Sequence, residues 1–247
     1  NAVNQLYSSR GFRTVLYKDE GTVADSEART PTYIPTGYTH VAGTTMEKGY
    51  VVEDPLGNQF VWVEVPKTST VYKTAGMNVK DFSDADYEAI ENDLHTYTSV
   101  YENGTNMVDE YFSEEATGLT EGQYNTQKKK MLKSIYRNGG FYIGRYETGI
   151  DYSEAPWTPT GNSTQTPVIK QNAYPYNYVT TPQAQTLSSG FAADGYSSSL
   201  MFNIQWQLIM KYLETKGVTQ AELSNDSTSW GNYKASTYNI INKNAKY

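Results

Sequence analysis

The sequence predicts an α+β fold, in which helices pack around small twisted antiparallel sheets and much of the chain forms irregular loops. Apolar residues recur at helical spacing in some segments, while others alternate or run apolar over strand-like lengths. Polar stretches rich in Gly, Pro, Ser, Thr and Asn separate these segments. The 247 residues fit one main domain with an extension, because no sharp change in composition divides the chain.

The stretch at residues 138–147 is the organising element. Gly139 and Gly140 suit a left-handed helix end followed by a tight turn, and the three residues after them favour a strand. Arg145 and Glu147 fall on the same predicted face as the apolar residues. We expect them to form a buried, mutually satisfied pair. The alternative is the start of a polar site.

The first third of the chain is predicted to hold a short strand, a linker and a hairpin. Residues 10–17 alternate as a strand, and residues 18–48 have little periodicity and predict an extended linker. Residues 49–66 predict a β-hairpin with its turn at residues 54–58. Its second strand is mostly apolar on both faces, so we expect it to be covered on both sides.

Four helices are predicted from their spacing and end signals. Ser83 or Asp84 begins the first, which runs to about residue 101. Thr120 opens the second, which Gly139 ends, through a capping box with Gln123. A short third helix is predicted with Thr181 as its N-cap and Pro182 as its first residue, and it ends near residue 189.

The fourth helix has the strongest pattern, at residues 198–216, with Gly217 as its C-terminal stop. Trp206 lies beside its apolar stripe. The chain turns polar from Thr219 onwards, which predicts loops and one or two weak strands.

Composition limits the classes of function. The net charge is −7, from 20 basic and 27 acidic residues, which argues against nucleic acid as a partner. No apolar run is long enough to span a membrane. Absence of Cys excludes disulfides and thiolate nucleophiles. The 23 tyrosines suit either binding faces or an extracellular β-rich protein that uses Tyr in place of Phe or Leu.

No motif predicts catalysis. His40 and His95 are isolated, and neither has the spacing of a transition-metal site. Acidic pairs, including Asp109 and Glu110, leave a structural calcium ion open, although such residues are more often solvated. We expect no other cofactor.

Several segments together resemble one family. They are QFVWVEVP at 59–66, MLKSI at 131–135, GGFYIGRYE at 139–147, SLMFNIQW at 199–206 and TSWGNY at 228–233. In combination they are similar to formylglycine-generating enzyme-like, or sulfatase-modifying-factor-like, domains of a surface or secreted bacterial branch. This resemblance implies a C-type-lectin-type fold.

The resemblance also implies a particular domain organisation. The Gly-Phe-Arg strand that ends family domains stands here near the N-terminus, at residues 11–13, and two expected C-terminal segments are absent. We therefore divide the chain into 1–17, 18–48 and 49–247. The first is a strand of a permuted or preceding domain, the second an extended linker, and the third the family-like domain without its C-terminal part. The alternative for the first strand is donation to a neighbouring subunit.

The family's chemistry does not carry over. Its oxidases hold copper with a cysteine pair, and the related sulfoxide synthases hold iron with histidines, but this chain has no Cys and two scattered His. We therefore predict a non-enzymatic, extracellular or surface-associated protein. The expected partner is a protein or glycan at a cell or phage surface, and self-association is a further expectation.

Two sets of site residues follow. In related lectin-type proteins diversified by retroelements a polar and aromatic C-terminal face contacts the ligand, which implies a ligand-binding set here: Trp230, Asn232, Tyr233, Tyr238 and Asn239. The candidate assembly strand comprises Gly11, Phe12, Arg13, Val15 and Leu16. An alternating strip at Tyr174, Tyr176 and Tyr178 is either exposed or one face of a strand.

Two alternative functions remain. One is a structural subunit of a filament or surface layer, joined through the N-terminal strand. The other is a degenerate relative of a metal-dependent oxidase, which predicts bound copper or iron.

Overall fold

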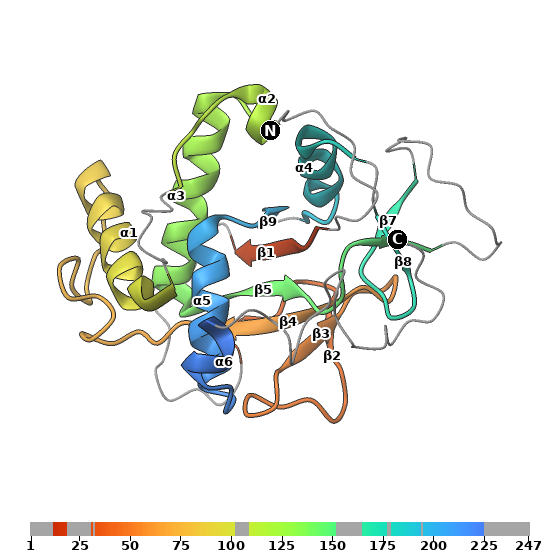
Figure 1. Ribbon diagram of the computed structural model, residues 1–247, viewed down its shortest axis with the longest axis horizontal. Helices are drawn as coiled ribbons and strands as arrows, with labels where there is room; N and C mark the ends of the chain where they lie inside the picture. The colour runs from red at the N-terminus through yellow and green to blue at the C-terminus, as the bar shows by residue number, and fades with distance from the viewer. Residues whose placement is uncertain are drawn as a thin grey trace.

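A computed structural model describes residues 12–18, 31, 33–101, 109–151, 165–176, 179–193 and 195–224. These residues form a mixed α+β structure with one six-stranded and one three-stranded antiparallel sheet (Figure 1). The predicted α+β class is therefore confirmed.

The larger sheet contains six strands that are not in chain order. From one edge to the other they are β2 (Thr39–His40), β3 (Val51–Glu53), β4 (Gln59–Glu64), β5 (Gly140–Gly144), β1 (Thr14–Lys18) and β9 (Tyr196–Leu200). The strand from the start of the chain, β1, thus lies inside the sheet, between β5 and β9.

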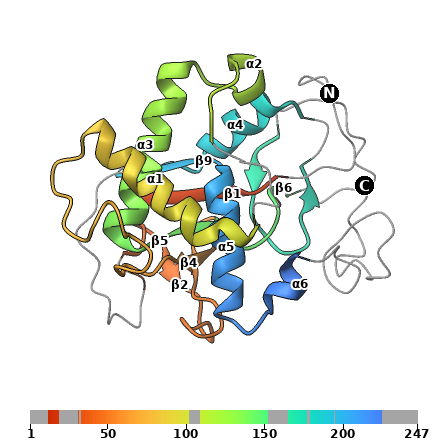
Figure 2. The same cartoon turned by 60° about the vertical axis from the view of Figure 1, so that its left-hand side comes forward.

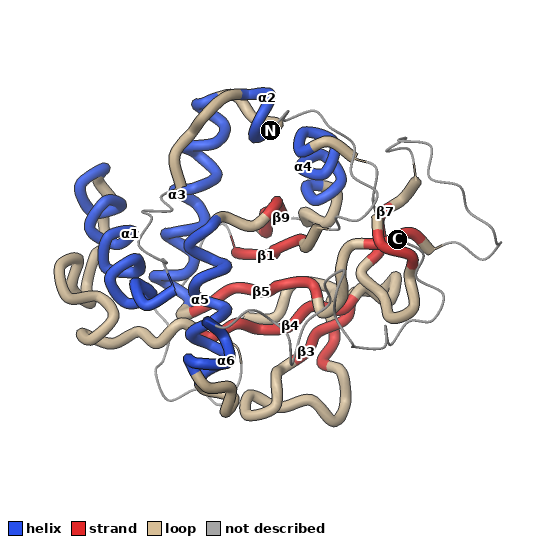
Figure 3. Tube along the Cα trace, viewed as in Figure 1, coloured by secondary structure: helices blue, strands red, loops and turns tan. Residues whose placement is uncertain are grey.

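The smaller sheet lies beside one end of the larger one (Figure 3). Its strands are β7 (Pro167–Val168), β6 (Gly149–Ile150) and β8 (Tyr174–Pro175), in this spatial order. Tyr176 follows β8 and is fully buried, with its ring 6.2 Å from that of Phe12. The prediction of an exposed strip through Tyr174 and Tyr176 is therefore wrong. Tyr178 lies outside the described residues.

The predicted hairpin is confirmed as β3 and β4. The Asp54 carboxylate accepts hydrogen bonds from the backbone N–H groups of Leu56 and Asn58, both at 2.8 Å, which fixes the turn. Both faces of β4 are covered, since Phe60 and Val63 are buried on opposite sides.

The helices are α1 (Asp84–Thr98), which a 3-10 turn at Ser99–Tyr101 extends, α2 (Glu114–Thr117), α3 (Glu121–Asn138), α4 (Thr181–Ser189), α5 (Asn203–Glu214) and α6 (Gln220–Ser224). Helices α3 and α5 pack on one face of the larger sheet, and α1 packs on both of them (Figures 1 and 2). Among the residues described, no helix combines the length and apolar character needed to cross a bilayer.

Local end signals place the first two predicted helices correctly. Ser83 and Thr120 each cap a helix through a capping box, and Gly139 ends α3 with a φ of 69°. For α4 the prediction was one residue late, because Thr180 is the N-cap and Pro182 lies at the second position.

Two apolar cores lie on opposite faces of the larger sheet. Val15, Val63 and Phe141 join the core under the helices. Leu16 and Tyr142 join the other, which is rich in aromatic side chains: Tyr33, Tyr50, Phe60, Trp62, Tyr142 and Tyr196. Many of the tyrosines in the described chain are therefore core residues.

The predicted helix at residues 198–216 is wrong at its start. Residues 198–200 belong to β9, and the helix begins only at Asn203. Hydrogen bonding to β1 favours the strand, and serine has no strong helix propensity to oppose it. Trp206 does lie beside the apolar stripe, since Ile204 and Leu208 are buried while its own side chain is 48% exposed.

The prediction that Arg145 and Glu147 form a buried pair is also wrong. Strand β5 ends at Gly144, so the alternation that would have buried these side chains stops there. Both residues are exposed, and Arg145 donates a hydrogen bond to the side-chain oxygen of Gln59 at 2.8 Å.

Part of the predicted linker contributes to the fold. Tyr33 is buried in the aromatic core, and its backbone carbonyl accepts a hydrogen bond from the Tyr142 hydroxyl at 2.8 Å. Strand β2 adds an exposed rung to the sheet edge. Residues 19–30 and 32 lie outside the described chain.

Close packing at the start of β5 predicts that Gly140→Ala is strongly destabilising. An added Cβ would lie 2.4 Å from the Val63 carbonyl oxygen and 2.6 Å from the Trp62 ring. We expect a loss of about 3 kcal/mol in the free energy of unfolding, measured by urea denaturation. The matched control is Gly122→Ala, whose Cβ would meet no atom within 4 Å. Equal stabilities for the two variants would contradict this packing.

Candidate functional site

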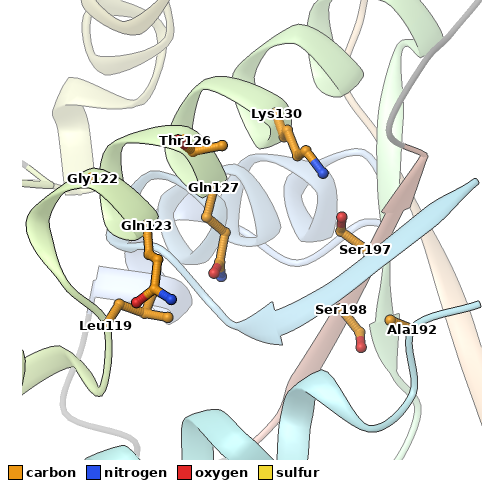
Figure 4. A pocket seen from close by; sticks show the side chains of 9 residues that line it. All are labelled: Leu119, Gly122, Gln123, Thr126, Gln127, Lys130, Ala192, Ser197 and Ser198. Carbon is orange, nitrogen blue, oxygen red and sulfur yellow. The ribbon is translucent and has the colours of Figure 1, made fainter.

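A groove of about 400 Å³ lies beside the edge strand β9, with α3 on one side and the end of α4 on the other (Figure 4). Its lining residues come from α3 and the turn before it, from the segment after α4, and from β9. They are Leu119, Gly122, Gln123, Thr126, Gln127, Lys130, Ala192, Ser197 and Ser198. This groove is the candidate functional site.

Strand register decides which groups of β9 face the groove. The N–H and C=O of Tyr196 both bond to Ala193, at 2.9 and 3.2 Å, on the side of the strand away from β1. Alternate residues of a strand direct their peptide groups to the same side. Ser198 and Leu200 therefore also present their peptide groups away from β1.

The two outer rungs of this edge are already occupied. Ala193 pairs with Tyr196, and the Gln185 side-chain oxygen accepts a hydrogen bond from the Leu200 N–H at 3.2 Å. Between them, the bonds among the described residues give the Ser198 peptide group no partner on this side. Within the described part of the chain, this edge is therefore closed at both ends and open at one residue.

The Ser198 side chain is also unpartnered. It lines the groove, its residue is only 6% exposed, and its hydroxyl has no hydrogen-bond partner within the described structure. A buried hydroxyl without a partner costs free energy, because it has given up its bonds to water. Its oxygen has almost no accessible surface, so the protein itself encloses this hydroxyl.

The chemistry of the lining suits recognition. Amides and hydroxyls come from Gln123, Gln127 and the two serines, and Lys130 supplies a positive charge. The described lining includes no histidine or carboxylate, so neither serine hydroxyl has a general base within the groove. A polar ligand can be held and oriented here without a nucleophile being activated.

A second, smaller cavity of about 170 Å³ shares Leu119 and Gln127 with the groove. It extends toward Phe202 and Asp109 at the start of α5. The Gln185 amide donates to the Gln127 side-chain oxygen at 3.4 Å, and both residues line this cavity. The amide pair therefore connects α4 to α3 across the end of the groove.

A cluster of titratable residues lies near this cavity. Glu91 and His95 on α1 and the buried Asp109 bring their ligand atoms within 4.8 Å of one another. Lys128 of α3 joins them, with its ammonium 3.0 Å from the Glu91 carboxylate and donating to the Asp109 carbonyl at 2.9 Å. Lys128 therefore supplies a positive charge directly beside this cluster.

The Asp109 carboxylate has a structural task. It accepts hydrogen bonds from the Asn203 and Ile204 N–H groups, at 2.6 and 3.0 Å, and so caps α5 from a distant part of the chain. Phe202, the residue at the N-cap position, offers no side-chain bond of its own. Helix capping and charge pairing therefore explain the cluster. The expectation that Asp109 is exposed to solvent is wrong, because its residue is buried.

The predicted ligand-binding residues cannot be compared with the groove. Trp230, Asn232, Tyr233, Tyr238 and Asn239 all lie outside the described residues, as does Gly11.

The other residues of the candidate assembly strand lie at the centre of the fold. Val15 and Leu16 are fully buried on opposite faces of β1, and Arg13 donates to the Gly144 carbonyl at 2.8 Å. Phe12 packs against Tyr176.

Sequence reasoning missed the groove because it assigned Ser198 to a helix. One signal was present, since residues 197–199 are three consecutive serines, a poor start for a helix and compatible with a strand. No sequence pattern indicates that this strand lies at an edge, which depends on β1 pairing with its other side.

Comparison of the chain with protein-family models, with curated proteins and with solved structures found no match. The resemblance to formylglycine-generating enzyme-like domains therefore stays a prediction.

The buried position of Asp109 predicts an unusual pH dependence. Burial raises the pKa of this carboxyl, and the two N–H donors of α5 oppose the rise only in part. The folded chain then binds the proton more tightly than the unfolded chain, so this group's contribution to stability falls as pH rises from about 4, the ordinary Asp value, to the raised one. The variant Asp109→Asn lacks this pH-dependent contribution to stability, because the Asn side chain does not titrate.

We therefore expect the free energy of unfolding of Asp109→Asn to rise relative to the wild type as pH rises through that window, measured by urea denaturation at each pH. Asp109→Ala lacks the same titrating group and also the acceptor that Asn retains, so we expect it to be about 2 kcal/mol less stable than Asp109→Asn at every pH. A difference between Asn variant and wild type that stays constant with pH would rule out a raised pKa.

Proposed function

We propose that this chain is a non-enzymatic, extracellular binding protein and that the groove beside β9 is its ligand site. The observation that carries the proposal is the single open rung at Ser198, where the peptide group lacks a partner on the outer side of β9 within the described structure. Its neighbours on the same edge are closed by Ala193 and Gln185. An edge protected everywhere except at one recess favours a binding site over a packing defect.

The proposal includes the scaffold. We assign the chain to the formylglycine-generating enzyme-like group of C-type-lectin-type folds, on the segments that resemble it. Four of these segments fall in elements that share the larger sheet and its helical core: β4, the end of α3, β5, and β9 with the start of α5. These segments thus form one packed unit, and residues 228–233 lie outside the described chain.

The position of β1 favours this proposal over a filament built by strand donation. Both edges of β1 pair within its own chain, with β5 on one side and β9 on the other. Donation to a neighbour would require β1 to leave the two strands of its own chain with which it pairs here. The residue types of the Glu91–His95–Asp109 cluster, with a lysine among them, likewise give the oxidase alternative no particular support.

Filling the groove tests the proposal. Gly122 lines it, and a Cβ there meets no atom within 4 Å, so Gly122→Trp adds a bulky side chain at the groove without disturbing the core. The full chain is screened against a glycan array and a phage-displayed random peptide library. We expect ligands from these panels to bind Gly122→Trp at least tenfold more weakly, because the indole occupies their volume, with an unchanged melting temperature.

The matched control is Asn125→Trp, since Asn125 is exposed on the same helix and is not part of the groove lining. It should bind like the wild type. Ligands that bind the wild type and Gly122→Trp equally would contradict the groove as the site. A wild-type chain that binds nothing on either panel would contradict the binding function.

A further inference from the structure

We propose that the smaller cavity at the start of α5 binds a small organic ammonium ion. The charged group of this ligand meets the buried Asp109 carboxylate, and its alkyl part lies against aromatic and apolar walls. The cavity of about 170 Å³ shares two lining residues, Leu119 and Gln127, with the groove. The inference goes beyond the proposed binding function of the groove and does not depend on it.

The Asp109 carboxylate is a buried negative charge without a paired cation. Its residue lines the cavity and is 7% exposed, and the ion pairs among the described residues do not include it. Lys128 donates to the backbone carbonyl of Asp109, but its ammonium pairs with Glu91 at 3.0 Å. Buried charges in proteins are normally paired, so this carboxylate favours a cationic ligand.

The electrostatic balance at Asp109 supports the same conclusion. Burial raises the pKa of this carboxyl, against the opposing effects of the Ile204 and Asn203 N–H groups and of His95. The groups around the carboxylate therefore compensate its lost hydration only in part. A cation bound beside it supplies the remainder.

The aromatic walls of the cavity also attract a cation. Tyr124 and Phe202 both line it, with their ring centroids 5.4 Å apart in an edge-to-face arrangement. Burial raises the pKa of Tyr124, and the negative charges of Asp109, Glu91 and Glu110 raise it further, which indicates a negative potential at this wall. An ammonium ion within about 6 Å of a ring centroid gains cation–π energy, most of all when it is shielded from water.

The rest of the lining favours an organic ion over a metal ion. Calcium takes about six to eight oxygen ligands, whereas the Gln185 and Gln127 side-chain oxygens already accept hydrogen bonds here. The volume lies well below the roughly 300 Å³ at which drug-sized sites begin, so the ligand is small. Apolar side chains suited to an alkyl group complete the walls: Ala116, Leu119, Leu200 and Met201.

The test uses the full chain with carbon-13 in its methionine methyl groups. Met201 lines the cavity, so its resonance, assigned with Met201→Leu, reports on what the cavity holds. Met131, a core residue outside the lining, is the internal control. We expect n-butylammonium to shift the Met201 resonance with a dissociation constant of about 1 mM, since so small a ligand makes few contacts. The neutral analogue n-butanol should bind at least about tenfold more weakly, and butyrate should cause no shift.

Removal of the carboxylate charge gives an independent measure. Asp109→Asn keeps an acceptor for the α5 N–H groups, and we expect it to bind n-butylammonium at least about tenfold more weakly. The matched control is Glu110→Gln, which makes the same charge change at the next residue, exposed and outside the lining. Its affinity should stay within about twofold of the wild type, because salt screens an exposed charge.

Three outcomes would overturn the inference. One is a Met201 resonance that n-butylammonium does not move. Another is equal affinity for n-butylammonium and n-butanol, which would show that the cavity selects apolar volume alone. The third is an equal Met201 shift with potassium or calcium ions, which would make the cavity a site for inorganic cations. If Asp109→Asn does not fold, the comparison of ligands on the wild-type chain decides alone.

Discussion

The position of β1 between β5 and β9 is the constraint on which the rest of the fold depends. Its residues are buried on both faces, with Val15 in the core under the helices and Leu16 in the aromatic core. Its two edges hydrogen-bond strands that are distant in sequence from it and from each other. One strand thus joins the two cores and completes the ladder. Conformational entropy opposes such long-range pairing, and apolar burial on both faces offsets it.

The candidate site is a consequence of this arrangement. Because β1 pairs one side of β9, the other side becomes a sheet edge, which a protein must protect. Here protection comes from α4, through the Gln185 side chain, and from the segment after it, through Ala193. Each protects one rung, and the recess at Ser198 lies where neither reaches. The groove therefore depends on tertiary contacts that lie far from β9 in sequence.

Local signals in the sequence were enough for the elements that local physics determines. Ser83, Thr120 and Gly139 set helix ends correctly because capping involves only neighbouring residues. Predictions failed where a distant partner decides. The start of the helix predicted at residue 198 became a strand because β1 pairs with it, and Arg145 lies exposed because β5 ends one residue earlier. Asp109 looked solvated because its partners, the first N–H groups of α5, are 94 and 95 residues away.

The same reasoning explains why the candidate site was not predictable. Its central feature is the direction of a peptide group, which is common to every residue type and has no signature in sequence. Serine at position 198 adds a hydroxyl that is buried without a partner within the described structure, on the side of β9 away from α3 (Figure 4). A larger apolar side chain would fill that recess and avoid the cost of burying a hydroxyl. The open rung therefore follows from the backbone arrangement, and the serine side chain is not what creates it.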